Sequence, residues 1–151
     1  MLILALIIGI VAGSRAMMAP AFTTWAARGH GLQLEGSWLA FLGWGFTPWI
    51  FTIAALAELV TDQLPSTPSR KVPPQFIVRM LMGALCGAAI GIGAGAEIVG
   101  LVLGVVGALI GTFGGAALRS KLAAFFGKDR RAAIIEDIIA IALGIVVVVS
   151  L

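Results

Sequence analysis

The sequence is poor in charged residues and in the side chains that most often carry chemistry. Charged residues make up 11% of its 151 residues, and the chain has one cysteine, one histidine and no tyrosine. The single Cys86 excludes an intrachain disulfide or a cysteine cluster, and the single His30 excludes a multi-histidine metal or haem site within one chain. We therefore expect no cofactor and no enzymatic activity, since a nucleophile paired with a base is missing from the apolar segments.

Hydrophobic residues dominate instead, at 60% of the chain with a mean hydropathy of +1.10. Soluble domains carry about 25% charged residues, far more than this chain. Its length could hold four or five membrane-spanning helices of ~20 residues each, with no room for a separate soluble domain. We expect one integral membrane domain over residues 1–151, an all-α polytopic bundle in contact with the lipid bilayer. Nucleic-acid binding is not expected, because the basic residues cluster between apolar segments, where they set topology.

Five apolar segments follow one another, at residues 2–27, 37–60, 75–94, 98–126 and 132–151. The first lacks the basic start of a signal peptide and is expected to be a permanent span, although Gly13-Ser14-Arg15 and Pro20 interrupt it. Pro48 predicts a kink in the second. The four prolines within residues 61–74 predict a loop.

The basic residues predict an orientation for these five spans. The loop with Arg70 and Lys71 and the turn with Lys128, Arg130 and Arg131 would lie on the side of the N-terminus. The positive-inside rule then predicts a cytoplasmic N-terminus and an outside C-terminus, in the inner (plasma) membrane of the cell. Trp25 and Trp38 would fall at the outer interface, where tryptophan is enriched.

Glycines recur every three or four residues in the third and fourth segments. Small residues on one helix stripe let two backbones approach closely inside a membrane. We predict a glycine-rich helical hairpin, or a dimer face of a homo-oligomer, with a glycine-lined pore as the alternative. The residues concerned are Gly83, Gly87, Gly91, Gly95, Gly100, Gly104, Gly107 and Gly111.

Charged side chains inside the apolar segments are the best indication of function. Arg15 lies ~20 Å along the first segment at ~1.5 Å per residue, and charges at such depth are costly and often functional. Helical side chains lean toward the N-terminus of their own helix, so Arg15 and Glu58 are predicted to converge and pair. The candidate ion- or substrate-binding residues are Arg15, Glu58, Asp62, Arg119, Glu136 and Asp137.

The carboxylates in this group outnumber the arginines, even when Arg79 is counted with them. One carboxylate can then be protonated or help to hold a cation, which leaves metal binding open. The other interpretation is that these groups form ion pairs that fix the register of the helices, with the outermost ones hydrated at the membrane surface.

Four stretches resemble a family of small bacterial membrane proteins known as domain of unknown function number 4126. They are GSRAMMAP at residues 13–20, AELVTDQLP at 57–65, RMLMGAL at 79–85 and IED at 135–137. The family pattern usually has a lysine where this chain has Gln63. The resemblance implies a multi-helix inner-membrane protein and carries no activity with it.

These observations favour a small secondary transporter or ion-conducting protein for an ion or small solute, acting as a homo-oligomer. The alternative is a structural or assembly subunit of a membrane complex, whose charges and glycines serve packing alone. The threonines of the first two segments leave the same choice open, since they could line a polar path or bond back to helix carbonyls. They are Thr23, Thr24, Thr47 and Thr52.

Overall fold

The computed structural model describes residues 1–29, 31–64 and 72–151. Every regular element in these ranges is a helix, as predicted. They are α1 (Leu2–Ser14), α2 (Met18–Arg28), the short 3-10 helix η1 (Ala40–Gly43), α3 (Thr47–Thr61), α4 (Pro73–Gly93), α5 (Glu97–Phe126) and α6 (Asp129–Ser150). His30 and half of the predicted loop over residues 61–74, including Arg70 and Lys71, lie outside the described residues.

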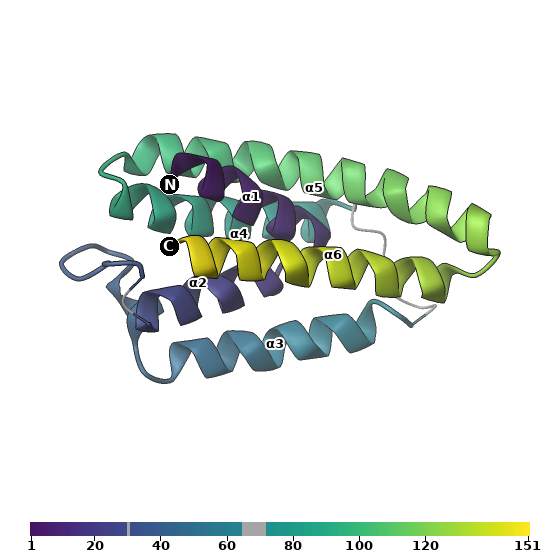
Figure 1. The fold of residues 1–151 in the computed structure, drawn as a ribbon, viewed down its shortest axis with the longest axis horizontal. Helices are drawn as coiled ribbons and strands as arrows, with labels where there is room; N and C mark the ends of the chain where they lie inside the picture. The colour runs from purple at the N-terminus through teal and green to yellow at the C-terminus, as the bar shows by residue number, and fades with distance from the viewer. Residues whose placement is uncertain (30, 65–71) are drawn as a thin grey trace.

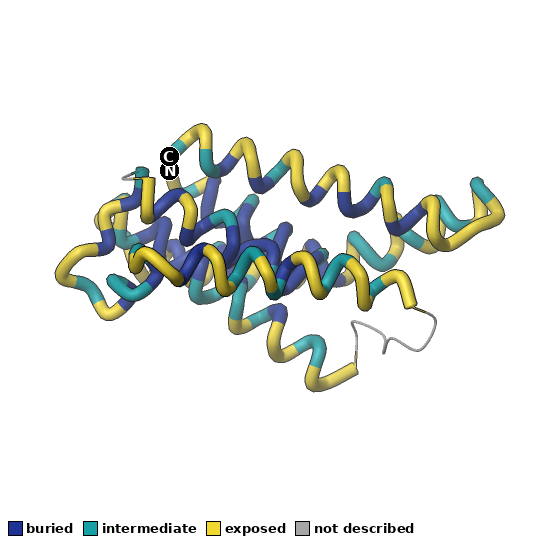
Figure 2. Tube along the Cα trace, turned by 90° about the horizontal axis from the view of Figure 1, so that it is seen from below, coloured by how far each residue is buried: buried dark blue, intermediate teal, exposed yellow. Residues whose placement is uncertain are grey.

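Three of the helices, α4, α5 and α6, are long and apolar enough to cross a membrane, while α1 and α3 are shorter apolar helices. Each helix buries one side against its neighbours and exposes the other (Figure 2). The exposed sides carry large apolar residues such as Ile98 and Val149, which are 78% and 80% exposed. Apolar surface on this scale is expected to face lipid.

The chain reverses direction between α1 and α2. α1 runs beside α5 from one end of the bundle, and α2 returns to that same end (Figure 1). A Cβ added at Gly93 would lie 3.4 Å from Met1 and 3.8 Å from Leu32, and one at Gly31 would lie 3.3 Å from Leu151. Both termini therefore lie at one end of the bundle (Figures 1 and 2). The prediction of one helix over residues 2–27 is wrong, and the two termini do not lie at opposite ends of the bundle as five consecutive spans would require.

Two prolines mark where helices begin. Pro20 lies in the first turn of α2 and Pro48 in the first turn of α3. The first N–H groups of a helix have no carbonyl partner within it, so a residue that lacks an N–H costs nothing there. The predicted kink at Pro48 is therefore wrong, because the helix starts at this point.

Helices α4 and α5 run antiparallel around a short turn in which Gly95 has φ +70°, a conformation that favours glycine. Their backbones are in close contact where glycines meet. A Cβ added at Gly87 would overlap the carbonyl oxygen of Gly100, and one at Gly104 would overlap that of Gly83. Gly95 itself has open space around it and serves the turn rather than the packing.

Helix α1 packs against the other glycines of α5. A Cβ added at Gly107 would overlap the carbonyl oxygen of Leu6, and one at Gly111 would overlap that of Ile10. The sequence predicts a hairpin or a dimer face for these two glycines, and the structure places both against α1 instead. The stripe on α5 turns gradually around the helix, so its first part contacts α4 and its second part contacts α1.

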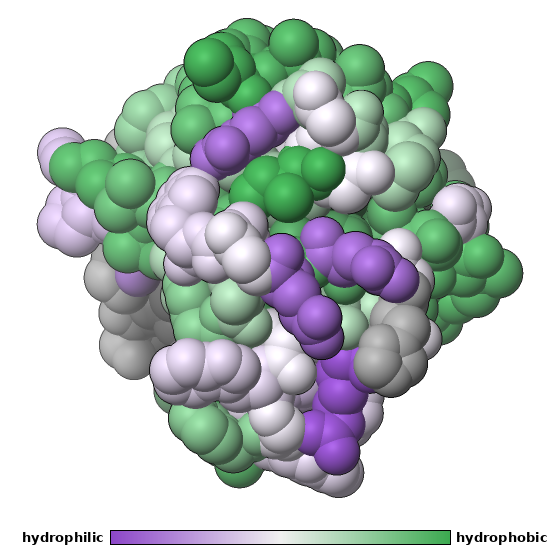
Figure 3. Space-filling model, turned by 90° about the vertical axis from the view of Figure 1, so that its left-hand side faces the viewer, coloured by the Kyte–Doolittle hydropathy of each residue, from purple (hydrophilic) through white to green (hydrophobic). Residues whose placement is uncertain are grey.

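The end that carries the termini has hydrophilic residues near the centre of its face and hydrophobic residues around them (Figure 3). All four tryptophans are on the segments that meet at this end. Trp38 donates a hydrogen bond to Glu97 at 2.6 Å, and the rings of Trp25 and Trp49 are 5.2 Å apart. Such a group of tryptophans is typical of a membrane interface.

Candidate ion site at a broken helix

The chain reversal leaves two helix ends inside the bundle, and side chains from other helices satisfy both. At the end of α1, Nη1 of Arg79 donates to the carbonyl oxygens of Gly13 and Ser14, each at 2.7 Å. The last carbonyls of a helix have no partner within it, and its C-terminus carries a partial negative charge. The buried guanidinium of Arg79, which is 2% exposed, supplies both the hydrogen bonds and the opposite charge.

The start of α2 is held by Glu58 from α3. Its two carboxylate oxygens accept hydrogen bonds from the backbone N–H groups of Ala16 at 2.8 Å and Met17 at 2.9 Å. Helix N-termini attract anions in this way. Arg15 and Glu58 therefore converge as predicted, but the predicted pairing between the two side chains is replaced by one between Glu58 and the backbone that follows Arg15.

Arg15 itself pairs with carboxylates from two helices. Its side chain is fully buried, and Nη1 lies 2.5 Å from Oδ2 of Asp62 at the end of α3. Nε donates to Oδ1 of Asp137 on α6 at 2.7 Å, and Nη2 lies 3.8 Å from Glu136. The planar guanidinium carries five N–H donors in a fork, which suits it to bridge several carboxylates at once. Arg15 thus ties the broken helix to α3 and α6.

Arg119 forms a second, more exposed group beside the first. It donates to both carboxylate oxygens of Asp129, at 2.8 and 3.0 Å, and lies 3.9 Å from Glu136. It also donates to the backbone carbonyl of Asp62 at 3.3 Å, which puts Arg119 level with the end of α3. Arg119 and Glu136 are both among the predicted site residues, but Asp129, which lies in the first turn of α6, is not.

The groups around Arg15 differ in burial. The side chains of Asp62 and Asp137 are 14% and 11% exposed, whereas that of Glu136 is 3% exposed and that of Arg15 is completely buried. Asp62 and Asp137 therefore keep some contact with the surroundings of the bundle, while Arg15 has none. Five carboxylates (Glu58, Asp62, Asp129, Glu136 and Asp137) and three arginines (Arg15, Arg79 and Arg119) make up this cluster.

The predicted site does not include Arg79, although an arginine inside an apolar segment is the same indication of function that points to Arg15.

The threonines of the first two predicted segments bond to the backbone. Thr23, Thr24 and Thr52 each donate to the carbonyl four residues earlier, at 2.9, 2.8 and 2.7 Å. Thr47 donates to the carbonyl of Phe41. Hydrogen bonds from threonine side chains to nearby helix carbonyls favour the interpretation in which these residues do not line a polar path.

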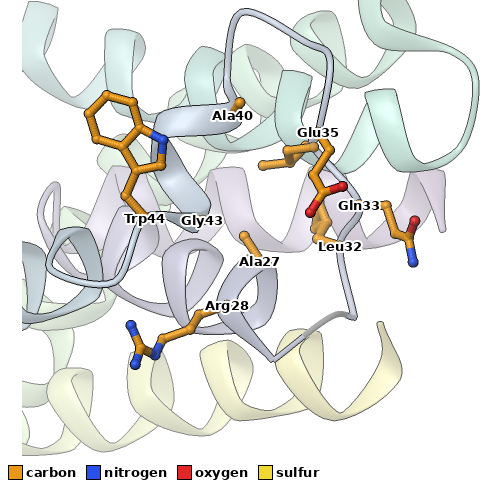
Figure 4. A pocket seen from close by; sticks show the side chains of 9 residues that line it. Ala27, Arg28, Leu32, Gln33, Glu35, Ala40, Gly43 and Trp44 are labelled. Carbon is orange, nitrogen blue, oxygen red and sulfur yellow. The ribbon is translucent and has the colours of Figure 1, made fainter.

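A hollow lies at the end of α2 that is farther from Arg15. Its volume is about 370 Å³, and Arg28, Glu35 and Trp44 surround it from three sides (Figure 4). Nη1 of Arg28 already donates to the carbonyl of Gly45 at 2.6 Å. This hollow opens at the surface that carries the termini and shares no residue with the charged cluster.

No group of three histidine, cysteine, aspartate or glutamate side chains in the described parts of the chain is arranged to hold a metal ion. No protein-family model, curated protein or solved structure matches this chain. The family resemblance stays a prediction.

Proposed function

We propose that this protein is a small secondary transporter or ion-conducting protein of the inner membrane, with Arg15, Asp62 and Asp137 as its ion or proton site. One observation carries the proposal. A fully buried arginine at the break of a reversing helix pair is ion-paired with carboxylates from two other helices. Many transporters build their ion sites at discontinuous helices, and ionisable groups deep in apolar segments are usually functional.

The orientation is part of the proposal. Between Glu97 and Arg119, α5 has no charged residue, a distance of about 33 Å at ~1.5 Å per residue. This is close to the ~30 Å of a bilayer's hydrocarbon core. Basic residues gather beyond Arg119, so we assign that end to the cytoplasm. Helices α3 to α6 would then cross the membrane, with the α4–α5 glycine contact inside it, while α1 and α2 enter from the outer face and return to it.

The proposed mechanism uses Arg15 as an internal cation that competes with the transported one. A proton or cation that binds Asp62 or Asp137 weakens the pairing of that carboxylate with Arg15. Because Arg15 lies in the helix break, a weaker pair loosens α1 and α2 from α3 and α6. The partial exposure of Asp62 and Asp137 supports loading from the cytoplasmic end. The cluster holds five carboxylates against three arginines, and this excess supports the presence of protons or monovalent cations in addition to the arginines.

The test is ion flux in liposomes that contain the purified protein. A pH gradient or a potassium or sodium gradient is imposed, and the internal pH is followed with a trapped dye. We expect a flux that depends on the protein and that Asp137→Asn and Asp62→Asn each reduce at least tenfold. Glu35→Gln is the matched control, since Glu35 is an exposed carboxylate at the opposite end.

Two results would contradict the proposal. If the wild-type protein supports no proton or cation flux, or if the flux is equal in Asp137→Asn, the cluster does not move ions. The alternative is then an assembly subunit, in which the same ion pairs only hold α3 and α6 against the broken helix. In that case the variants would lose stability or association with other membrane proteins, without any change in flux.

A further inference from the structure

A hollow of about 180 Å³ opens between α1, α5 and α6 on the side of the charged cluster. Its walls are mostly apolar, with Ile10, Gly114, Leu118 and Leu143 among them, and Glu136 of the charged cluster also lines it. A Cβ added at Gly114 would meet nothing within 4 Å, so the hollow exists because this helix face carries glycine. Along α5 it runs from Ile110 to Leu118, about 12 Å at ~1.5 Å per residue.

An apolar hollow of this size does not hold water. Engineered apolar cavities of roughly 150 Å³ stay dry and take up a hydrocarbon such as benzene. This hollow is open to the outside of the bundle, where the exposed faces of α5 and α6 meet lipid in the orientation proposed above. An empty space there would leave its walls without dispersion contacts. A stretch of acyl chain is the group that the bilayer offers.

The end of the hollow at Leu118 leads to basic side chains. Arg119 follows directly, with its side chain 19% exposed. Lys121 lies three residues beyond Leu118 on the same helix face and is exposed. Helical side chains lean toward the N-terminus of their helix, so Lys121 leans toward the hollow. Lys128 and Arg130 lie on the turn and the first residues of α6 nearby. Two acidic groups lie beside Arg119 at this end: Asp129 accepts hydrogen bonds from it, and Glu136 is 3.9 Å away.

We propose that this hollow binds one acyl chain of an anionic phospholipid, with its phosphate at Lys121 and Arg119. The apolar walls match the chain, and the basic end matches the charge of the headgroup, as in basic sites between helices on the cytoplasmic side of membrane proteins. The lipid comes from the leaflet on the basic side of the bundle. The hollow shares Glu136 with the charged cluster, but lipid binding here does not require ion movement through Arg15.

The experiment compares two lipids with identical acyl chains, phosphatidylglycerol and phosphatidylcholine, titrated onto the purified protein in detergent. Binding is followed by native mass spectrometry. We expect phosphatidylglycerol to bind more tightly. Lys121→Gln should reduce its affinity about fivefold, the factor that corresponds to ~1 kcal/mol for one basic residue near a lipid headgroup, and should leave phosphatidylcholine unchanged. Gly114→Leu should reduce the binding of both lipids, because its side chain fills the hollow.

Matched variants separate this site from general effects. Val102→Leu enlarges a side chain on α5 that is 51% exposed and outside the hollow, and should change neither affinity. Lys128→Gln removes a basic charge from the same end but not from the helix face of Lys121. Equal losses in Lys128→Gln and Lys121→Gln would overturn the proposal, because a diffuse basic surface would then explain the preference. Equal affinity for the two lipids would overturn the proposal too. So would a Gly114→Leu variant that converts a dimer to a monomer without changing lipid binding, because the occupant of the hollow would then be a second copy of this chain.

Discussion

Arg79 and Glu58 hold the two sides of one helix break. Arg79 donates to the carbonyls of Gly13 and Ser14, where α1 ends, and Glu58 accepts from the N–H group of Met17, just before α2 begins. Each side chain has the charge that the helix end beside it attracts. The bundle thus tolerates a sharp reversal of its backbone in apolar surroundings, where exposed peptide groups would be costly.

Removing the carboxylate of Glu58 should weaken this reversal. Hydrogen bonds to charged groups contribute about 1.5–3 kcal/mol each, so Glu58→Ala should lower the free energy of unfolding by at least this amount. Glu58→Gln keeps one acceptor oxygen and should lose roughly half as much. The measurement is unfolding by sodium dodecyl sulfate in mixed micelles, with Glu35→Gln as the control. Equal losses in the two Glu58 variants would show that charge rather than capping matters at this position.

The pairing of Arg15 with Asp137 should appear as an energetic coupling between the two residues. Arg15→Met leaves buried carboxylates without their cation and should cost on the order of 3–5 kcal/mol. Adding Asp137→Asn removes one of those charges, so the double variant should recover part of the loss. The same unfolding assay measures all four proteins of the cycle. Strictly additive effects would contradict a direct pair in the folded protein.

Two glycines of α5 should respond in opposite ways to the same substitution. Gly104→Ala places a methyl group against the carbonyl of Gly83 and should destabilise the protein by about 1–3 kcal/mol, the usual cost of overpacking. Gly114→Ala points into open space and should be neutral or stabilising by up to ~1 kcal/mol, because alanine favours the helix. Thermal unfolding in detergent distinguishes the two. Similar losses in both would mean that the α4–α5 contact is looser than described.

The sequence predicted the helical class and most segment boundaries, because apolar runs, prolines and basic turns are local signals. Residues 98–126 were predicted as one segment and form α5, which begins one residue earlier. The charged residues were also predicted to meet, since each is costly when isolated in an apolar segment.

The reversal at Arg15 could not be read from the sequence in the same way. Residues 2–27 are long and apolar enough to pass for one span, and Gly13-Ser14-Arg15 looks like a mild interruption of it. The turn is stabilised by the side chains of Glu58 and Arg79. They lie 42 and 66 residues further along the chain than the backbone groups to which they bond. The position of Pro20 was the local hint, because proline is favoured in the first turn of a helix. Because the reversal is missing from the prediction, the predicted N-terminus lies at the end of the bundle that carries Lys128, opposite to its place in the structure.

The proposed ion site depends on the chain turning back at Arg15 inside the membrane. Labelling introduced cysteines with a membrane-impermeant maleimide in intact cells tests this directly, since the native Cys86 is fully buried and stays silent. Leu2→Cys and Ser150→Cys should both be labelled from outside, whereas Lys128→Cys should be labelled only after the membrane is opened. Labelling of Leu2→Cys and Ser150→Cys from opposite sides would contradict the reversal, and with it the site built around Arg15.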